Sequence, residues 1–194
     1  MDITMGYKPN LIAFTEIWKP GFIVYQLLFK NSTNMPYCMI GSEPFVREIF
    51  LSMYGASRET GCEYCTASIV AFSLRRGALP SRIACESSTP KDDAMFSAVR
   101  ALAKMPSEFK ESHLKELQNH FVEEEIEWIL LAASFAGFIN LIAKTTGLEI
   151  AKLPLDEAAS VLAHTNWEAG KRAPADFSLP EPDGPLRNEQ QREK

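Results

Sequence analysis

Two cysteines three residues apart, Cys62 and Cys65, are the residues of this chain best suited to chemistry. Thr60 is a suitable helix cap, and Glu63 follows three residues later, as in a capping box. We therefore expect both thiols in the first turns of a helix that runs to about Arg76. Residues three apart share one helix face, and their Cα separation falls within the roughly 4.4–6.8 Å that a disulfide spans. Free amides and the dipole at the helix start favour a thiolate at Cys62, so the pattern predicts a redox-active dithiol.

Three other interpretations of the cysteine pair stay open at this point. Half of a zinc site would need a second pair of ligands, whereas Cys38 and Cys85 stand singly and are expected to be reduced thiols. Inert thiols packed in a core are the second interpretation, because free cysteine packs well among apolar side chains. The third is a thioredoxin-type domain, which requires strands around the motif.

Other polar residues are candidates for accessory roles. Tyr64, between the two cysteines, could donate a hydrogen bond to a sulfur or to a substrate, or serve only in packing. His113 and His120 stand in a charged segment typical of a surface, whereas His164, near the end of an apolar helix, is the better accessory candidate. Asn140 lies in an apolar stretch and must find a hydrogen-bond partner, most simply as a core amide that links helices.

Apolar residues recur at helical spacing along the chain, and no alternating strand pattern is found. The segment 128–143 contains only two polar residues, so we expect a helix that is buried on all sides and too short to span a membrane. Gly55 and Gly77 are expected to end the helices that precede them. The segment 11–29 is expected to form two short helices, or one helix and an arm. The other expected helices are 44–54, 60–76, 80–85, 92–104, 110–121, 123–144 and 155–163. The predicted fold class is all-α, a compact bundle of about seven to nine helices.

The composition limits the class of protein. The 194 residues are 46% hydrophobic and 23% charged with a net charge of −5, which argues for a globular chain and against a nucleic-acid partner. We expect one helical domain over 1–172 and a proline-rich polar tail over 173–194, either disordered or lying as an arm on a neighbouring subunit. No basic leader, membrane span or phosphate-binding loop is found, so we expect a cytoplasmic protein with no membrane partner, cofactor or metal.

Several motifs resemble one known family. The stretch Arg47-Glu48-Ile49, the motif Gly61-Cys62-Glu63-Tyr64-Cys65 and the segment 71–77 resemble the carboxymuconolactone decarboxylase and alkylhydroperoxidase D-like (AhpD-like) family. The segments 121–126 and 138–141 look like that family's second helix pair. The segment 166–171 resembles the tail of its peroxidase-related branch, which contains the Cys-x-x-Cys pair. The likeness covers about residues 36–172.

The resemblance implies an AhpD-like helical bundle that assembles into homo-oligomers, either trimers or hexamers. It implies that Cys65 attacks the oxygen of a peroxide and that Cys62 then resolves it as a disulfide. The helix-start argument instead makes Cys62 the more acidic thiol, and we expect that order for disulfide exchange. Glu48 corresponds to the family's relay glutamate and is the best base candidate, with an ion-paired or solvated glutamate as the alternative.

The sequence departs from the family in its proton relay. The family has a histidine four residues after the second cysteine, where this chain has Ile69, which cannot transfer a proton. Glu48 lies fourteen residues before Cys62, whereas the family's glutamate lies a dozen before it. We therefore expect an altered or lost relay. Lactone decarboxylation is not expected, because the family members that perform it lack the cysteine pair.

The sequence thus predicts a thiol-dependent oxidoreductase that reduces hydroperoxides or disulfides, with Cys62, Cys65 and Glu48 as its catalytic residues. Its disulfide would be reduced again by an external dithiol or a protein reductant. The alternative is a non-enzymatic helical oligomer in which the dithiol switches assembly or partner binding, and the missing histidine at position 69 motivates it.

Overall fold

The computed structural model describes residues 9–15, 17, 19–32, 44–85 and 89–182. In this part of the chain there are nine α-helices, one short 3-10 helix and no strand. The prediction of an all-α, AhpD-like compact bundle is confirmed. The elements are α2 (Asn10–Thr15), α3 (Lys19–Ser32), α5 (Pro44–Glu59), α6 (Glu63–Arg75), α7 (Pro80–Cys85), α8 (Pro90–Ala103), α9 (Glu111–Gln118), α10 (Glu123–Thr146), α11 (Lys152–Leu162) and η1 (Gly170–Arg172).

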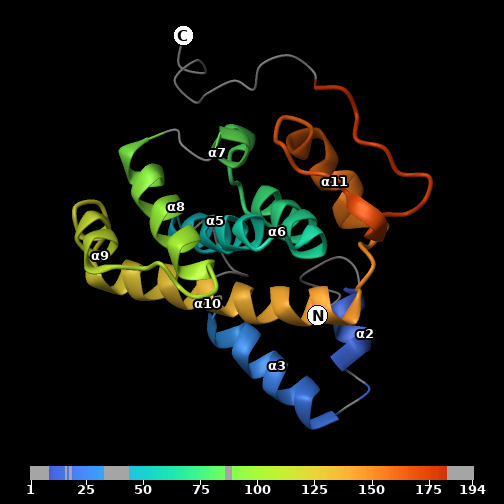
Figure 1. Cartoon of the computed structure of the whole chain (residues 1–194), viewed down its shortest axis with the longest axis horizontal. Coiled ribbons are helices and arrows are strands. Elements are labelled where there is room, and N and C mark those ends of the chain that lie inside the picture. The colour runs from blue at the N-terminus through green and yellow to red at the C-terminus, as the bar shows by residue number, and fades with distance from the viewer. Residues whose placement is uncertain (1–8, 16, 18, 33–43, 86–88, 183–194) are drawn as a thin grey trace.

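The core forms around α5, which packs along α10 on one side and against α6 and α8 on others (Figure 1). α11 covers α6, α9 joins α8 at one end of α10, and α3 packs on α10 from the side away from α6. One apolar cluster runs through all these helices, with Ile49, Val70 and Leu155 among its fully buried members. Burial of this cluster supplies the main driving force for the fold.

Helix α5 is longer than the sequence indicated. Gly55 was expected to end it near Tyr54, but the helix continues to Glu59. The structure gives a packing reason for the glycine: a Cβ at position 55 would lie 2.8 Å from Cγ2 of Val99 and 2.9 Å from Cδ1 of Phe96. The absent side chain lets α8 approach α5 closely, so the residue serves helix packing rather than helix termination.

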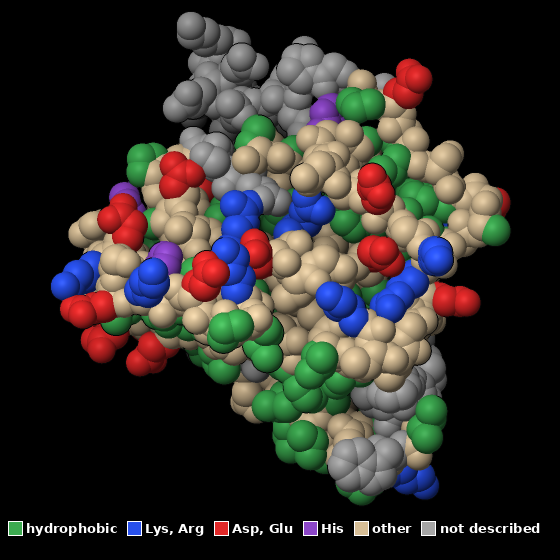
Figure 2. Space-filling model, in the orientation of Figure 1, with side chains coloured by type: hydrophobic (Ala, Val, Ile, Leu, Met, Phe, Trp, Pro, Cys, Tyr) green, Lys and Arg blue, Asp and Glu red, His purple; other side chains and the backbone are tan. Residues whose placement is uncertain are grey.

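Helix α10 differs from the prediction of burial on all sides. One face is buried, with Ile129 and Ala132 fully enclosed, but Leu131, Phe138 and Leu141 are exposed. Figure 2 shows apolar side chains gathered over α3 at the lower edge of the molecule, where Ile23, Val24, Leu27 and Leu28 are exposed. We call these seven exposed residues of α3 and α10 the apolar face.

Helix α10 is also long and apolar enough to cross a membrane by length and composition, contrary to the expectation that no segment is. Half of its most apolar window is buried inside the bundle, as in a core helix of a water-soluble fold, which passes the same test. Its place against α5 accounts for the buried half of that window.

The other expected helices are found within a few residues of their predicted bounds, including two helices within 11–29 and the stop at Gly77. The connector 33–43 with Cys38, and residues 183–194 of the expected tail, lie outside the described residues. Within the first part of that tail, Ala173, Phe177 and Leu179 pack against the core of the same chain.

We expect Gly55→Ala to lower the free energy of unfolding by about 1 kcal/mol. Overpacking of a filled core costs roughly 1–3 kcal/mol, which exceeds the gain of up to about 1 kcal/mol from replacing glycine in a helix. Gly137→Ala in α10 is the matched control, because nothing in the described structure lies within 4 Å of its added Cβ, and it should stabilise. Urea unfolding measures both variants, and equal stabilisation by the two would contradict the packing role of Gly55.

Candidate active site

The turn between α5 and α6 places the first cysteine. Thr60 was expected to cap the second helix, but its Oγ1 donates a 3.2 Å hydrogen bond back to the carbonyl of Ser57, at the end of α5. Gly61 then adopts a left-handed conformation with φ of 62°, which favours glycine. The N-cap of α6 is therefore Cys62 rather than Thr60, and the predicted capping box is absent because α5 extends to position 59.

Cys62 acts as the helix cap through its sulfur. Its Sγ accepts the backbone N–H of Cys65 at 3.4 Å, in the place where a serine or aspartate oxygen is usually found. A side-chain hydrogen bond from Cys65, aided by this backbone bond and by the positive charges of Arg172 and Lys144, lowers the pKa of the Cys62 thiol against the opposing effect of burial. Cys62 thus carries a larger thiolate fraction than an ordinary cysteine.

Cys65 has the opposite character. Burial in apolar surroundings raises the pKa of its thiol well above the ordinary value, and the hydrogen bond to Cys62 raises it further. The structure therefore brings the two side chains together as a protonated thiol at Cys65 that donates to a sulfur at Cys62. Two interacting titratable groups with pKa values pushed apart are typical of acid–base pairs in active sites.

Arg172 links two helix ends that lie beside the cysteine pair. Its Nη1 and Nη2 donate to the carbonyls of Ala143 and Lys144 at 2.7 and 2.8 Å, at the C-terminal end of α10. Its Nε lies 4.0 Å from Oε2 of Glu63, the first residue of α6. The guanidinium thereby joins the start of α6 to the end of α10 beside the cysteines, so the positive charge near Cys62 is fixed by both helices.

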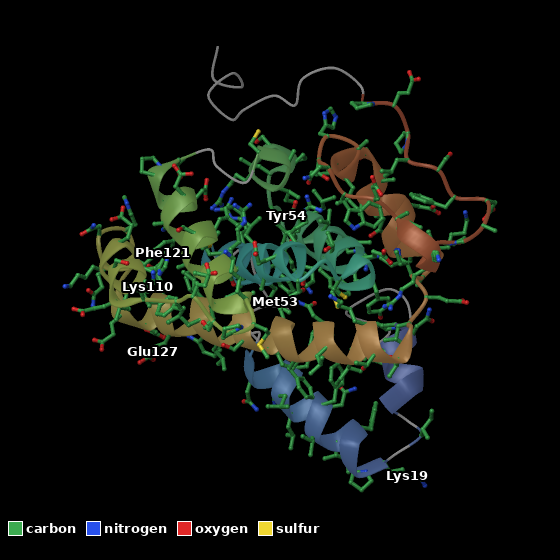
Figure 3. All side chains as sticks on the ribbon, in the orientation of Figure 1. Lys19, Met53, Tyr54, Lys110, Phe121 and Glu127 are labelled. Carbon is green, nitrogen blue, oxygen red and sulfur yellow. The ribbon has the colours of Figure 1, made fainter. Side chains whose placement is uncertain are left out.

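A cavity of about 50 Å³ opens beside Cys65. Its wall comes from α2, α3, α5, α6 and α10 and is largely apolar and aromatic. Met53, labelled in Figure 3, lies on this wall, whereas its neighbour Tyr54 faces away and donates a 3.1 Å hydrogen bond to the carbonyl of Ile83. The polar residues on the wall are Tyr64, Cys65, Ser68 and Asn140, and the apolar ones are Pro9, Leu11, Tyr25, Phe29, Phe50, Met53, Ile69, Phe72, Ala136 and Ile139.

Glu48, the predicted base, does not line this cavity. Its carboxylate is buried, and Oε1 accepts a 3.1 Å bond from Nη2 of Arg82 in α7, which also pairs with Asp92 of α8. The resemblance favoured Glu48 as a base, but Arg82 of a later helix pairs with it and also with Asp92. The ion-paired alternative describes its place in the structure.

Of the accessory candidates, Tyr64 and Asn140 lie at the cavity and His164 does not. The hydroxyl of Tyr64 accepts the backbone N–H of Leu11 at 3.3 Å, which ties α2 to α6 and makes α2 part of the wall. His113 instead accepts the backbone N–H of Lys110 at 3.0 Å, and neither it nor His120 reaches this wall. No histidine of the described residues stands in for the missing relay.

Sequence reasoning missed Ser68 and Arg172. Ser68 follows Cys65 by three residues, so its place on the same helix face could have been found from spacing. Nothing in the sequence around Arg172 pointed to the site, because its contacts depend on how the chain folds back after α11. In the described part of the chain, no group of three metal-ligating side chains stands together, and Cys85 is exposed.

No protein-family model matches the chain, and no curated protein matches it. Among solved structures, the chain is similar to the debrominase Bmp8. A cysteine-to-alanine variant of Bmp8 in complex with 2,3,4-tribromopyrrole aligns with a TM-score of 0.71 and 17% identity over 83% of this chain and 87% of that one. The apo form aligns with a TM-score of 0.67 and 21% identity over 81% and 87%. The fold is therefore one that an enzyme also uses.

We expect Cys65→Ala to raise the pKa of Cys62, because the variant removes the side-chain hydrogen bond that lowers it most. Ultraviolet thiolate absorbance, followed during a pH titration, measures the change. In the wild type the first thiolate forms below the pH at which an ordinary cysteine ionises, and in Cys65→Ala that transition moves upward. Cys85→Ala, which removes an exposed thiol, should leave it in place. An unchanged first transition in Cys65→Ala would contradict the hydrogen-bonded pair.

Proposed function

We propose that this protein is a dithiol-dependent reductase of small molecules, with Cys62 and Cys65 as its redox centre. The single observation that carries the proposal is the hydrogen-bonded cysteine pair, with pKa values shifted in opposite directions, whose second member lines a cavity. An inert pair of core thiols needs neither the cavity nor the nearby positive charges.

The burial of both sulfurs favours a small substrate over a protein disulfide. Cys62 is 0% exposed and Cys65 is 2% exposed, so the disulfide of a folded protein would not reach either one. A small molecule could reach Cys65 through the cavity. Of the two substrate classes expected from the sequence, a hydroperoxide is therefore the better fit.

The proposed reaction begins at Cys65. Its sulfur attacks the terminal oxygen of a hydroperoxide ROOH as its proton passes to the Cys62 thiolate. The S–O bond forms, the O–O bond breaks, and the leaving RO⁻ takes up that proton as ROH, so that Cys65 becomes a sulfenic acid. Proton transfer between positioned groups accelerates such steps, and here the base is the partner cysteine.

The second step closes the disulfide. The Cys62 thiolate attacks the sulfur of the Cys65 sulfenic acid and expels hydroxide, which takes a proton from solvent to give water. An external dithiol then reduces the Cys62–Cys65 disulfide and is itself oxidised. The complete cycle converts ROOH and one external dithiol into ROH, water and one external disulfide.

This scheme accounts for the altered relay. Ile69 cannot carry a proton, and Glu48 is engaged by Arg82. The scheme needs neither residue, because the acid and the base are the two thiols. Arg172 and Lys144 favour the Cys62 thiolate through their charges, which supports its use as the proton acceptor.

The size of the cavity favours a short substrate. An engineered cavity of about 150 Å³ binds benzene, and the cavity beside Cys65 has about a third of that volume. The peroxide group and a short alkyl chain fit this space more readily than a ring does. The burial that raises the pKa of Cys65 keeps its thiol protonated until a substrate arrives.

A second candidate is the removal of halogen from a small aromatic ring. Two observations favour it: the shared fold with a debrominase bound to a tribrominated pyrrole, and the aromatic wall of the cavity. The balanced reaction takes an aryl bromide and the two thiols to the debrominated ring, the Cys62–Cys65 disulfide, bromide and a proton. The cavity would have to widen to admit the ring.

We also propose a homo-oligomer in which the apolar face is covered by a second copy of the chain. The exposed residues of the apolar face lie on two helices that pack together, and large exposed apolar patches mark protein interfaces. On α10 the exposed Leu131 and Phe138 lie seven residues apart and therefore on one stripe, as in helix-to-helix contacts between subunits. The trimer or hexamer expected from the family resemblance is one way to cover this surface.

Turnover of ethyl hydroperoxide with dithiothreitol tests the proposed function. Cys65→Ser should lose turnover, because the attacking sulfur is gone. Without dithiothreitol, Cys62→Ser should react slowly and once, giving a sulfenic acid that dimedone traps. Cys85→Ser is the matched control and should keep the wild-type rate. Release of bromide from 2,3,4-tribromopyrrole, measured with the same variants, tests the second candidate.

Full peroxide turnover in Cys65→Ser would overturn the reductase. No turnover in the wild type with any of these substrates, together with a change of oligomer mass on oxidation, would favour the non-enzymatic redox switch.

We expect Leu27→Glu and Phe138→Glu to lower the oligomer mass measured by light scattering, because each places a charge within the apolar face. Leu153→Glu is the matched control: Leu153 is an exposed apolar residue of α11, outside that face, and the variant should keep the wild-type mass. A monomeric wild type would contradict the proposed assembly.

A further inference from the structure

Two buried polar atoms on the cavity wall have no hydrogen-bond partner among the described residues. They are Nδ2 of Asn140 and Oγ of Ser68. The two residues are 1% and 6% exposed, so solvent does not satisfy them from outside the bundle. Leaving such groups unpaired costs about 1–3 kcal/mol each, which is reason to ask what they bind.

The side chain of Asn140 is held in one orientation. Its Oδ1 accepts a 3.0 Å hydrogen bond from Oγ of Ser57 in α5. The two hydrogens of Nδ2 are therefore the part of the amide left for a group in the cavity. A core amide that served only to link helices would use its donor as well, as buried polar groups usually do.

Ser68 complements this donor from α6. It lies three residues after Cys65, on the same helix face, and both line the cavity. The buried Ser52 and Ser73 each bond to a helix carbonyl, as Ser73 does to that of Ile69 at 2.8 Å. The hydroxyl of Ser68 makes no such bond within the described structure, so it remains available to donate or accept.

We infer that Ser68 and Asn140 form a polar subsite that binds the oxygens of the substrate beside Cys65. The inference rests on the proposed function and names two residues that position its substrate. Asn140 donates from Nδ2 to the oxygen that leaves as RO⁻ when the O–O bond breaks. Ser68 bonds the same group, and the apolar wall receives the short alkyl chain.

This subsite also separates the two candidate functions. An amide N–H binds an oxygen acceptor well, and a halogen on an aromatic ring offers a poor one. A pair of unused donors beside the reacting sulfur therefore favours the hydroperoxide. An ordered water is the other occupant that could satisfy both groups, and the experiment below distinguishes it.

Binding is measured without chemistry in a Cys65→Ser background. Ethyl hydroperoxide is titrated into this protein while NMR follows the backbone amides of α6 and α10 and the side-chain amide of Asn140. The same titration is made after adding Asn140→Leu, Ser68→Ala or the control Ser73→Ala, a buried serine of the same helix that does not line the cavity. Thermal unfolding of each variant reports any loss of folding.

We expect the Asn140 side-chain amide to shift on titration and Kd to rise about tenfold in Asn140→Leu and in Ser68→Ala, equivalent to about 1.4 kcal/mol, while Ser73→Ala keeps the Kd of the background. In proteins with both cysteines, kcat/KM for ethyl hydroperoxide should fall with the same two variants. Alkylation of Cys65 by methyl iodide, which carries no oxygen, should stay within about twofold of the wild type.

Equal Kd in all variants would overturn the subsite, and it would mean that the two groups bind water only. If Asn140→Leu fails to fold, Ser68→Ala decides the matter alone. Asn140-dependent binding with no turnover in the wild type would overturn the proposed reductase but support the subsite. Cys65-dependent turnover with the same Kd in all variants would overturn the subsite but support the proposed reductase.

Discussion

The hydrogen bonds between Cys65 and the sulfur of Cys62 are the interaction on which the rest of the site depends. They exist because α5 runs on to Glu59 and Gly61 then reverses the chain, which leaves Cys62 as the N-cap of α6. Had the helix begun at Thr60, Cys62 would lie inside its first turn, and its sulfur would not accept the N–H of Cys65. The backbone turn thus decides which sulfur is the acceptor and which is the donor.

Burial and hydrogen bonding shift the pKa values of the two cysteines in opposite directions. Cys62 receives two hydrogen bonds and the influence of two cations, so its thiolate is stabilised although it is fully enclosed. Cys65 faces a largely apolar cavity, and its burial outweighs the charge of Arg172 and raises its pKa, so its thiol stays protonated. The helix-start argument and the family resemblance disagreed about which cysteine leads the reaction. The geometry reconciles them, because the more acidic thiol and the thiol that meets the cavity are different residues.

Helix periodicity carried most of the fold prediction, since amphipathic spacing and glycine stops such as Gly77 are local signals. The errors arose where tertiary packing overrides those signals. Gly55 resembles a helix stop in the sequence, because its close packing against α8 is visible only in the structure. The apolar composition of α10 likewise does not show that one of its faces is exposed. In the site, the cysteine spacing was sufficient to find the pair, whereas it could not show that Glu48 pairs with Arg82, which lies in a later helix.

Ile69 has two linked consequences for the site. An aliphatic side chain on the cavity wall removes a proton carrier, and it also makes the surroundings of Cys65 drier. Such burial raises the pKa of the Cys65 thiol, so the attack that we propose for Cys65 needs a base more than it would in a wet site. The only strongly perturbed titratable partner described beside Cys65 is Cys62. In the reaction that we propose, Cys62 accepts the proton, because position 69 has no histidine to carry it. The same apolar wall that lacks the histidine makes proton transfer to Cys62 more important.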